Sequence, residues 1–132
     1  MTYKQLLERY VKKHGELHKS KLLDKSLWLA WSIGLERNYT DLGTYVDKPG
    51  DHGIGPPCFA FDLGRKNRFF FKGWNYLTAR RLAKFYWRER DALSIEYVIL
   101  GHRIISREIP HWHRFDRDDS HMFHIHVSGI HE

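Results

Sequence analysis

The chain has 132 residues, of which 42% are hydrophobic and 15% aromatic, and its formal net charge is +6. This composition is typical of one globular domain and excludes a largely disordered chain. No apolar run reaches the ~20 residues of a membrane span, and the first residues lack the apolar core of a secretory signal. We therefore expect no membrane insertion and no signal peptide. The single cysteine, Cys58, excludes an internal disulfide and a four-cysteine zinc site.

Two helices are predicted in the first third of the chain. Thr2 is placed to cap the first, and Gly15 to end it. Asp24 is placed to cap the second. Apolar residues at helical spacing give each helix one inner face. These residues are Tyr3, Leu6, Leu7, Tyr10 and Val11 in the first helix, and Leu27, Ala30, Trp31 and Leu35 in the second.

The middle of the chain is predicted to hold a long loop, a short strand and a third helix. Residues 38–57 are rich in Asn, Asp, Gly and Pro, so we expect a loop of the length that often serves function. Residues 58–63 form an apolar run that predicts a buried strand, and residues 64–72 a basic turn. Asn75 is placed to cap a helix with Ala79, Leu82, Ala83 and Tyr86 as its inner stripe.

The last third is predicted to be β-structure. Residues 95–100 are β-branched and aromatic, and Ile104 and Ile105 can continue a hairpin after Gly101. Residues 115–120 are polar and predict a loop, whereas residues 123–128 alternate as a strand. Helices followed by strands predict an α+β fold, with N-terminal helices and one later helix packed on a small antiparallel sheet.

Most of the ten histidines lie in the C-terminal quarter of the chain. On a strand, His124 and His126 point to the same face, because side chains alternate with period two. Two such imidazoles can share a metal ion, or one can bind the ion while the other acts as a base. A run of surface histidines without function is about as good an interpretation of this motif taken alone.

Asp62 is the only acidic residue between His52 and Glu89, and it lies in an apolar run. An ionised carboxylate in such a setting is costly unless it is paired or bound to a metal. A salt bridge to Arg65 or a cap on the following turn would also account for it. A catalytic zinc site needs about three protein ligands and one open position for water. The histidine pair and Asp62 supply part of such a set, and His52 in the long loop is a candidate for the remainder.

In order and spacing, His52, Asp62 and the motif His121-x-x-His124-x-His126 resemble the M15 (LAS-type) zinc peptidases, the group of D-Ala-D-Ala carboxypeptidases and L-Ala-D-Glu endopeptidases. The resemblance is strongest to small domains of actinobacteria and their phages and covers roughly residues 51–129. Its front half is longer than the family pattern, with Gly55-Pro56-Pro57 between the first two residues.

The resemblance implies one catalytic domain over residues 1–132, with a helical N-terminal part at 1–37 and a metal-site core at 51–129. It makes His52, Asp62 and His126 the ligands of a Zn²⁺ ion. His124 becomes the candidate general base and His121 a supporting catalytic residue, although the sequence does not decide which of the two takes the proton.

The implied function is that of a zinc-dependent peptidoglycan peptidase, which cuts an amide bond in the bacterial stem peptide, as in a phage lysin or virion-associated enzyme. Such a protein would be made in the cytoplasm and act at the cell wall. Arg103 and Trp112 are candidate substrate-binding residues. An arginine such as Arg103 more often lies on the surface, in contact with water, without a role in binding.

The stretch 65–90 carries nine basic residues against one acid, Glu89, and could bind anionic wall polymers. A solvated helix face explains the same charges. Two other functions therefore stay open. One is a basic nucleic-acid-binding or phosphoesterase-type protein, and the other is a catalytically inactive structural domain with the same fold.

Overall fold

The computed structural model describes residues 1–43, 57–64, 75–115 and 124–130. Within this part the fold is α+β, with four α-helices and an open sheet of six antiparallel strands in the order β1-β2-β6-β3-β4-β5. The coarse class predicted from the sequence is thus confirmed. The helices are α1 (Tyr3–His14), α2 (Trp28–Glu36), α3 (Tyr76–Arg88) and α4 (Arg90–Leu93), and a 3₁₀ turn, η1 (Lys25–Leu27), precedes α2. The strands are β1 (Thr40–Gly43), β2 (Ala60–Gly64), β3 (Ile95–Leu100), β4 (Arg103–Ser106), β5 (His113–Arg114) and β6 (His124–Gly129).

Helices α1 and α3 begin where the sequence predicts. The Thr2 hydroxyl accepts a hydrogen bond from the Gln5 amide, and the Gln5 side chain accepts one from the Thr2 amide, so a capping box starts α1. Gly15 follows the helix with φ +86°, a backbone region that favours glycine. Asn75 caps α3 by accepting from the Thr78 amide. Local capping signals therefore fix both helices.

The second helix differs in detail from its prediction. Asp24 accepts from the Ser26 amide and caps the 3₁₀ turn η1, and α2 follows directly. The predicted inner face is mostly correct, because Leu27, Ala30 and Trp31 are buried.

The long loop predicted for residues 38–57 is partly wrong. Thr40–Gly43 form strand β1, which pairs with β2 at the edge of the sheet. Asp41 and Gly43, which have weak strand propensity, are thus held extended by the neighbouring strand. Residues 44–56 lie outside the described part of the chain. The predicted strand at 58–63 appears as Ala60–Gly64.

The C-terminal strand β6 lies inside the sheet, between β2 and β3. Ile125 and Val127 are fully buried on one face of the sheet, as the alternation predicts. Phe123, the first residue of the predicted strand, lies outside the described residues. Because β6 pairs with β2, residues about sixty positions apart in the chain become neighbours in the sheet. This pairing decides which side chains lie together.

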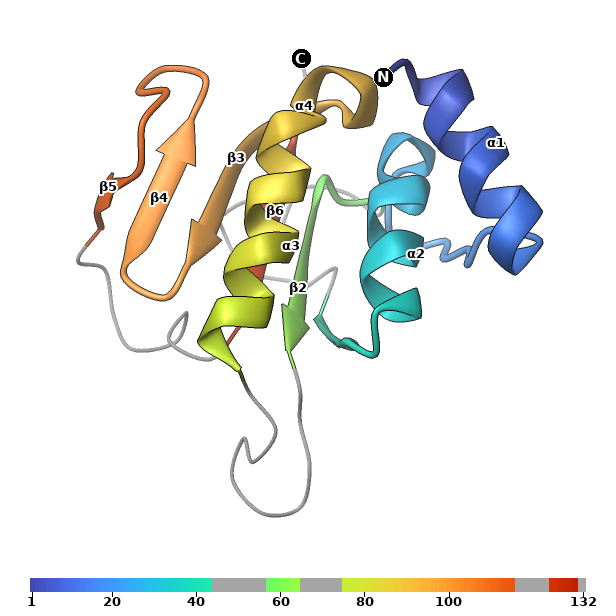
Figure 1. The fold of residues 1–132 in the computed structure, drawn as a ribbon, viewed down its shortest axis with the longest axis horizontal. Coiled ribbons are helices and arrows are strands. Elements are labelled where there is room, and N and C mark those ends of the chain that lie inside the picture. The colour runs from blue at the N-terminus through green and yellow to red at the C-terminus, as the bar shows by residue number, and fades with distance from the viewer. Residues whose placement is uncertain (44–56, 65–74, 116–123, 131–132) are drawn as a thin grey trace.

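The helices cover one face of the sheet (Figure 1). Phe61 of β2 packs edge-on against Tyr86 of α3, with ring centroids 6.1 Å apart. The Tyr86 hydroxyl donates to the Ala30 carbonyl of α2 at 2.7 Å. Gly34 of α2 leaves room for Leu63 and Tyr86, because a Cβ at this position would overlap both side chains. The core thus lies between α2, α3 and the facing side of the sheet.

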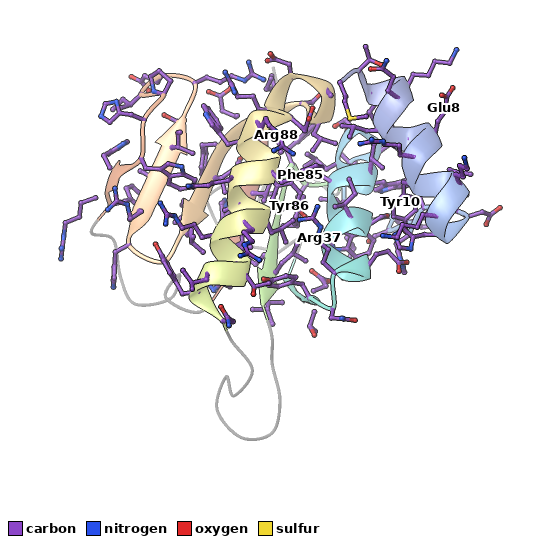
Figure 2. The ribbon with its side chains drawn as sticks, viewed as in Figure 1. Glu8, Tyr10, Arg37, Phe85, Tyr86 and Arg88 are labelled. Carbon is purple, nitrogen blue, oxygen red and sulfur yellow. The ribbon has the colours of Figure 1, made fainter. Side chains whose placement is uncertain are left out.

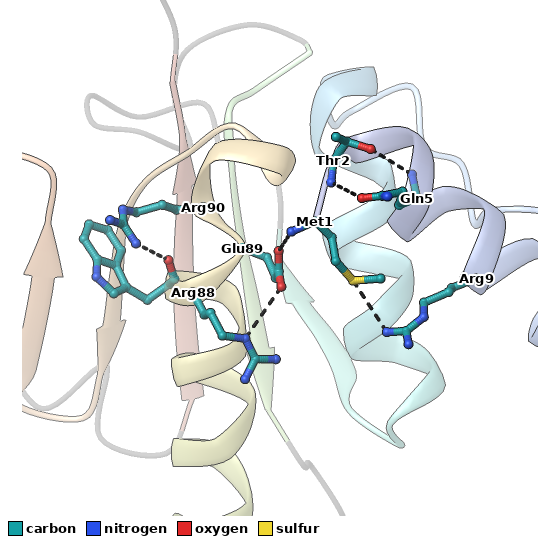
Figure 3. A network of polar contacts seen from close by, with 8 residues as sticks. Met1, Thr2, Gln5, Arg9, Arg88, Glu89 and Arg90 are labelled. Carbon is teal, nitrogen blue, oxygen red and sulfur yellow. Dashed lines mark hydrogen bonds and ion pairs between the residues drawn. The ribbon is translucent and has the colours of Figure 1, made fainter.

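The N-terminus is held against the junction of α3 and α4 (Figure 3). The Met1 amino group lies 3.3 Å from a carboxylate oxygen of Glu89, which is 8% exposed. Arg88 contacts the other oxygen of the same carboxylate at 3.6 Å. This ion pair holds the start of α1 against the junction of α3 and α4.

Candidate functional site

The candidate site lies where β2 and β6 pair. The antiparallel register puts Asp62 directly opposite His126 and Gly64 opposite His124. Directly opposite residues of paired strands point to the same face. Asp62, His124 and His126, called the sheet cluster below, therefore share the face of the sheet that is turned away from α3.

The two imidazoles of the sheet cluster meet one carboxylate oxygen. His126 Nδ1 lies 2.9 Å from Asp62 Oδ1, and His124 Nε2 lies 3.7 Å from the same oxygen. Because an ionised carboxylate only accepts, Nδ1–H of His126 is the donor of the shorter contact. The exposed fractions of the side chains are 20% for Asp62, 13% for His124 and 5% for His126. The cluster is thus largely shielded from water but open at His124 and Asp62.

Tyr97 of β3 supports the ring of His126 from the neighbouring strand. The two rings are stacked, with centroids 5.5 Å apart and planes at 16°. Tyr97 is paired with Ser128, two residues from His126 on the same face, so the contact is a diagonal one across the sheet. The His126 imidazole is therefore fixed from two sides, by a carboxylate and by an aromatic ring. Sequence reasoning missed Tyr97, because its position beside β6 depends on the strand order.

The donor atoms of the sheet cluster suit a zinc ion, which prefers imidazole nitrogen and carboxylate oxygen when cysteine is absent. No group of three or more His, Cys, Asp or Glu side chains in the described residues is arranged to hold a metal ion as it stands. Asp62 Oδ1 and His126 Nδ1 are joined to each other by a hydrogen bond.

Two predicted site residues cannot be placed. His52, the third predicted ligand, and His121, the supporting catalytic residue, both lie outside the described residues. The structure therefore brings together Asp62, His124 and His126 and leaves the rest of the predicted set as a prediction.

Arg103 and Trp112, the predicted substrate-binding residues, do not join the sheet cluster. Arg103 is paired with Leu100 of β3, whose side chain belongs to the helix-covered face. It donates to the Trp112 carbonyl at 3.4 Å. With Tyr76, Arg80 and Leu100, the two residues line a cavity of about 310 Å³ between the start of α3 and the β3–β4 turn. The sheet therefore separates this cavity from Asp62.

Cys58 takes no part in the sheet cluster. Its thiol is fully buried and donates to the Ala60 carbonyl at 3.3 Å. Burial raises the pKa of the Cys58 thiol above its ordinary value. A buried protonated thiol behaves as a small core residue.

Comparison of the chain with protein-family models, with curated proteins and with solved structures gave no match.

Proposed function

We propose that the protein is a zinc-dependent hydrolase that cuts an amide bond in the stem peptide of bacterial peptidoglycan. The observation that carries the proposal is the convergence of Asp62, His124 and His126 on one partly open face, with both imidazoles within 4 Å of a single carboxylate oxygen. The choice of peptidoglycan as substrate rests on the sequence resemblance alone.

Asp62 and His126 are the described residues that would hold the ion. When bound, a zinc ion polarises a carbonyl and lowers the pKa of its water to about 7. Asp62 supplies negative charge, and His126 supplies a nitrogen whose ring is fixed by Tyr97. A fixed ring costs little further ordering when a ligand binds.

His124 is the residue placed to move a proton. It lies at the first position of β6, and its side chain is more exposed than that of His126. A general base must come within hydrogen-bond reach of its proton donor, and an imidazole at the open end of the cluster meets that requirement. In the proposed reaction His124 Nε2 takes a proton from the attacking water and returns it to the leaving amine.

The direct test is the zinc content of the purified full chain by elemental analysis, after loading with zinc and removal of excess metal. We expect about one zinc per chain. Asp62→Asn and His126→Gln, which keep the size of each side chain, should lose most of it. His111→Ala is the matched control, because His111 is exposed and lies outside the sheet cluster. A folded parent without zinc would contradict the metal site.

The substrate is tested separately with purified peptidoglycan. We expect zinc-loaded protein to release free amino groups, and we expect a chelator or His124→Ala to stop the release. Zinc binding without release of amino groups from any peptidoglycan would contradict the peptidase while leaving the metal site intact.

A second candidate function, binding of a polyanion such as nucleic acid, is favoured by the outer face of α3. Arg80, Arg81, Lys84 and Arg88 are all exposed there. Figure 2 shows Phe85 near Arg37 and Arg88, and their guanidinium carbons lie 4.7 and 5.4 Å from the centre of its ring. Such a surface would bind DNA with an affinity that falls steeply with salt concentration. Measurement of DNA binding at several salt concentrations tests this candidate.

A further inference from the structure

We infer that the cavity beside the start of α3 is a binding site for a small phosphomonoester that also contains a flat ring, such as a nucleoside monophosphate. The cavity lies on the helix-covered face of the sheet, away from the sheet cluster, and the inference does not rest on the proposed hydrolase. Its volume, about 310 Å³, is at the lower end of the range of small-molecule sites.

Two guanidinium groups from different elements reach this cavity. Tyr76 and Arg80 lie one turn apart on the same face of α3, and Arg103 begins β4. In the described part of the chain neither arginine is paired with a carboxylate, and Arg103 donates to the Trp112 carbonyl. The guanidinium fork matches phosphate oxygens in pairs, and two such groups balance a phosphomonoester of charge about −2.

The strand pairing adds positive charge at the same place. Arg103 lies directly opposite Arg114 of β5, so two like charges occupy one cross-strand pair. The positive charge gathered at this edge of the sheet favours an anionic ligand beside Arg103.

The rest of the lining favours a flat ring on the ligand. Tyr76 and Trp112 contribute aromatic surface, and Leu100 contributes an apolar side chain that is almost completely buried. Aromatic side chains bind flat rings by stacking. Inorganic phosphate alone would leave this surface unused, so the site fits a phosphate with a ring attached.

The test is isothermal titration of the full chain with adenosine 5′-monophosphate, adenosine and inorganic phosphate. We expect the monophosphate to bind more tightly than either fragment. Arg80→Gln and Arg103→Gln should each weaken its binding about tenfold. Trp112→Leu should weaken binding of the monophosphate but not of inorganic phosphate. Arg81→Gln is the matched control, because Arg81 is an exposed neighbour on α3 that does not line the cavity.

Several results would overturn the inference. Failure of the folded parent to bind the monophosphate would exclude the site. An equal loss of affinity in Arg81→Gln and Arg103→Gln would show general attraction to a basic surface. Adenosine binding as tightly as its monophosphate would exclude the phosphate contact, and inorganic phosphate binding as tightly would exclude the ring contact. Zinc content bears on none of these outcomes, so failure here is distinct from failure of the proposed hydrolase.

Discussion

The sheet and the helical layer each hold one carboxylate flanked by two histidines. In the helical layer Glu36 of α2 is contacted by His18 Nε2 at 3.0 Å and His14 Nδ1 at 3.4 Å. We call Glu36, His14 and His18 the helix cluster. Its composition and contact distances are close to those of the sheet cluster, so a list of contacts would treat the two alike.

Burial separates the two clusters. In the helix cluster the Glu36 and His18 side chains are 32% and 45% exposed, whereas His126 in the sheet cluster is 5% exposed. Ion pairs exposed to water contribute little, because solvent screens them and both side chains stay flexible. A shielded pair costs more to break, since the remaining partner keeps its desolvation penalty. The burial of a carboxylate–histidine contact therefore decides how much it contributes to the free energy of unfolding.

The largest expected contrast is between Asp62→Ala and Glu36→Ala. Asp62→Ala removes the acceptor of a nearly buried imidazole and should lower the free energy of unfolding by about 1 to 3 kcal/mol. Glu36→Ala should change it much less, because water can replace the lost contacts. Urea unfolding followed by circular dichroism at neutral pH measures both. Asp62→Asn, which keeps an acceptor oxygen, should fall between the parent and Asp62→Ala. Equal losses in the two alanine variants would refute the role given to burial.

A smaller contrast uses two tyrosine hydroxyls and no histidine. The Tyr86 hydroxyl donates to the Ala30 carbonyl within the core, whereas the Tyr10 hydroxyl donates at 3.2 Å to Glu36 Oε1, whose side chain is 32% exposed. Tyr86→Phe removes a hydrogen bond inside the core and should lower the free energy of unfolding by about 1 kcal/mol. Tyr10→Phe should lower it by less. Thermal unfolding of both variants checks the order, and a larger loss for Tyr10→Phe would show that burial does not rank these contacts.

The elements that the sequence predicts well are those set by short-range signals. Thr2 and Asn75 cap their helices as expected, because capping needs only the next three residues. The pattern from Ile95 to Leu100 predicts β3 with correct bounds. By contrast, β1, the two-residue β5 and the short α4 were missed. Thr40–Gly43 are extended because β2 lies beside them, and this cause is not local.

The same distinction applies to the candidate site. Period-two alternation alone places His124 and His126 on one face, and β6 confirms it. The sequence does not reveal that β6 lies between β2 and β3, and this order sets Asp62 and Tyr97 on either side of His126. The sequence names Arg103 as a candidate substrate-binding residue without fixing its strand register, and that register puts it on the face opposite the sheet cluster.

The smallest effect expected is the pH dependence that Glu36 gives to stability. The hydrogen bond from His18 is the main cause that lowers the pKa of the Glu36 carboxyl below its ordinary value. Burial opposes this shift, and the hydrogen bond from Tyr10 adds to it. A carboxyl whose pKa is lower in the folded state stabilises the fold above its unfolded pKa, and this stabilisation is lost as pH falls through the folded pKa. Urea midpoints measured from pH 7 to pH 3 should therefore show the parent above Glu36→Gln at neutral pH. The difference should shrink below about pH 4.5, the ordinary pKa value for glutamate.

Glu8→Gln is the matched control, because Glu8 is exposed on α1 and contacts neither histidine of the helix cluster in the described residues. Its midpoint should follow that of the parent at every pH. A difference between parent and Glu36→Gln that stays constant down to pH 3 would mean that the helix cluster does not hold Glu36 in its charged form.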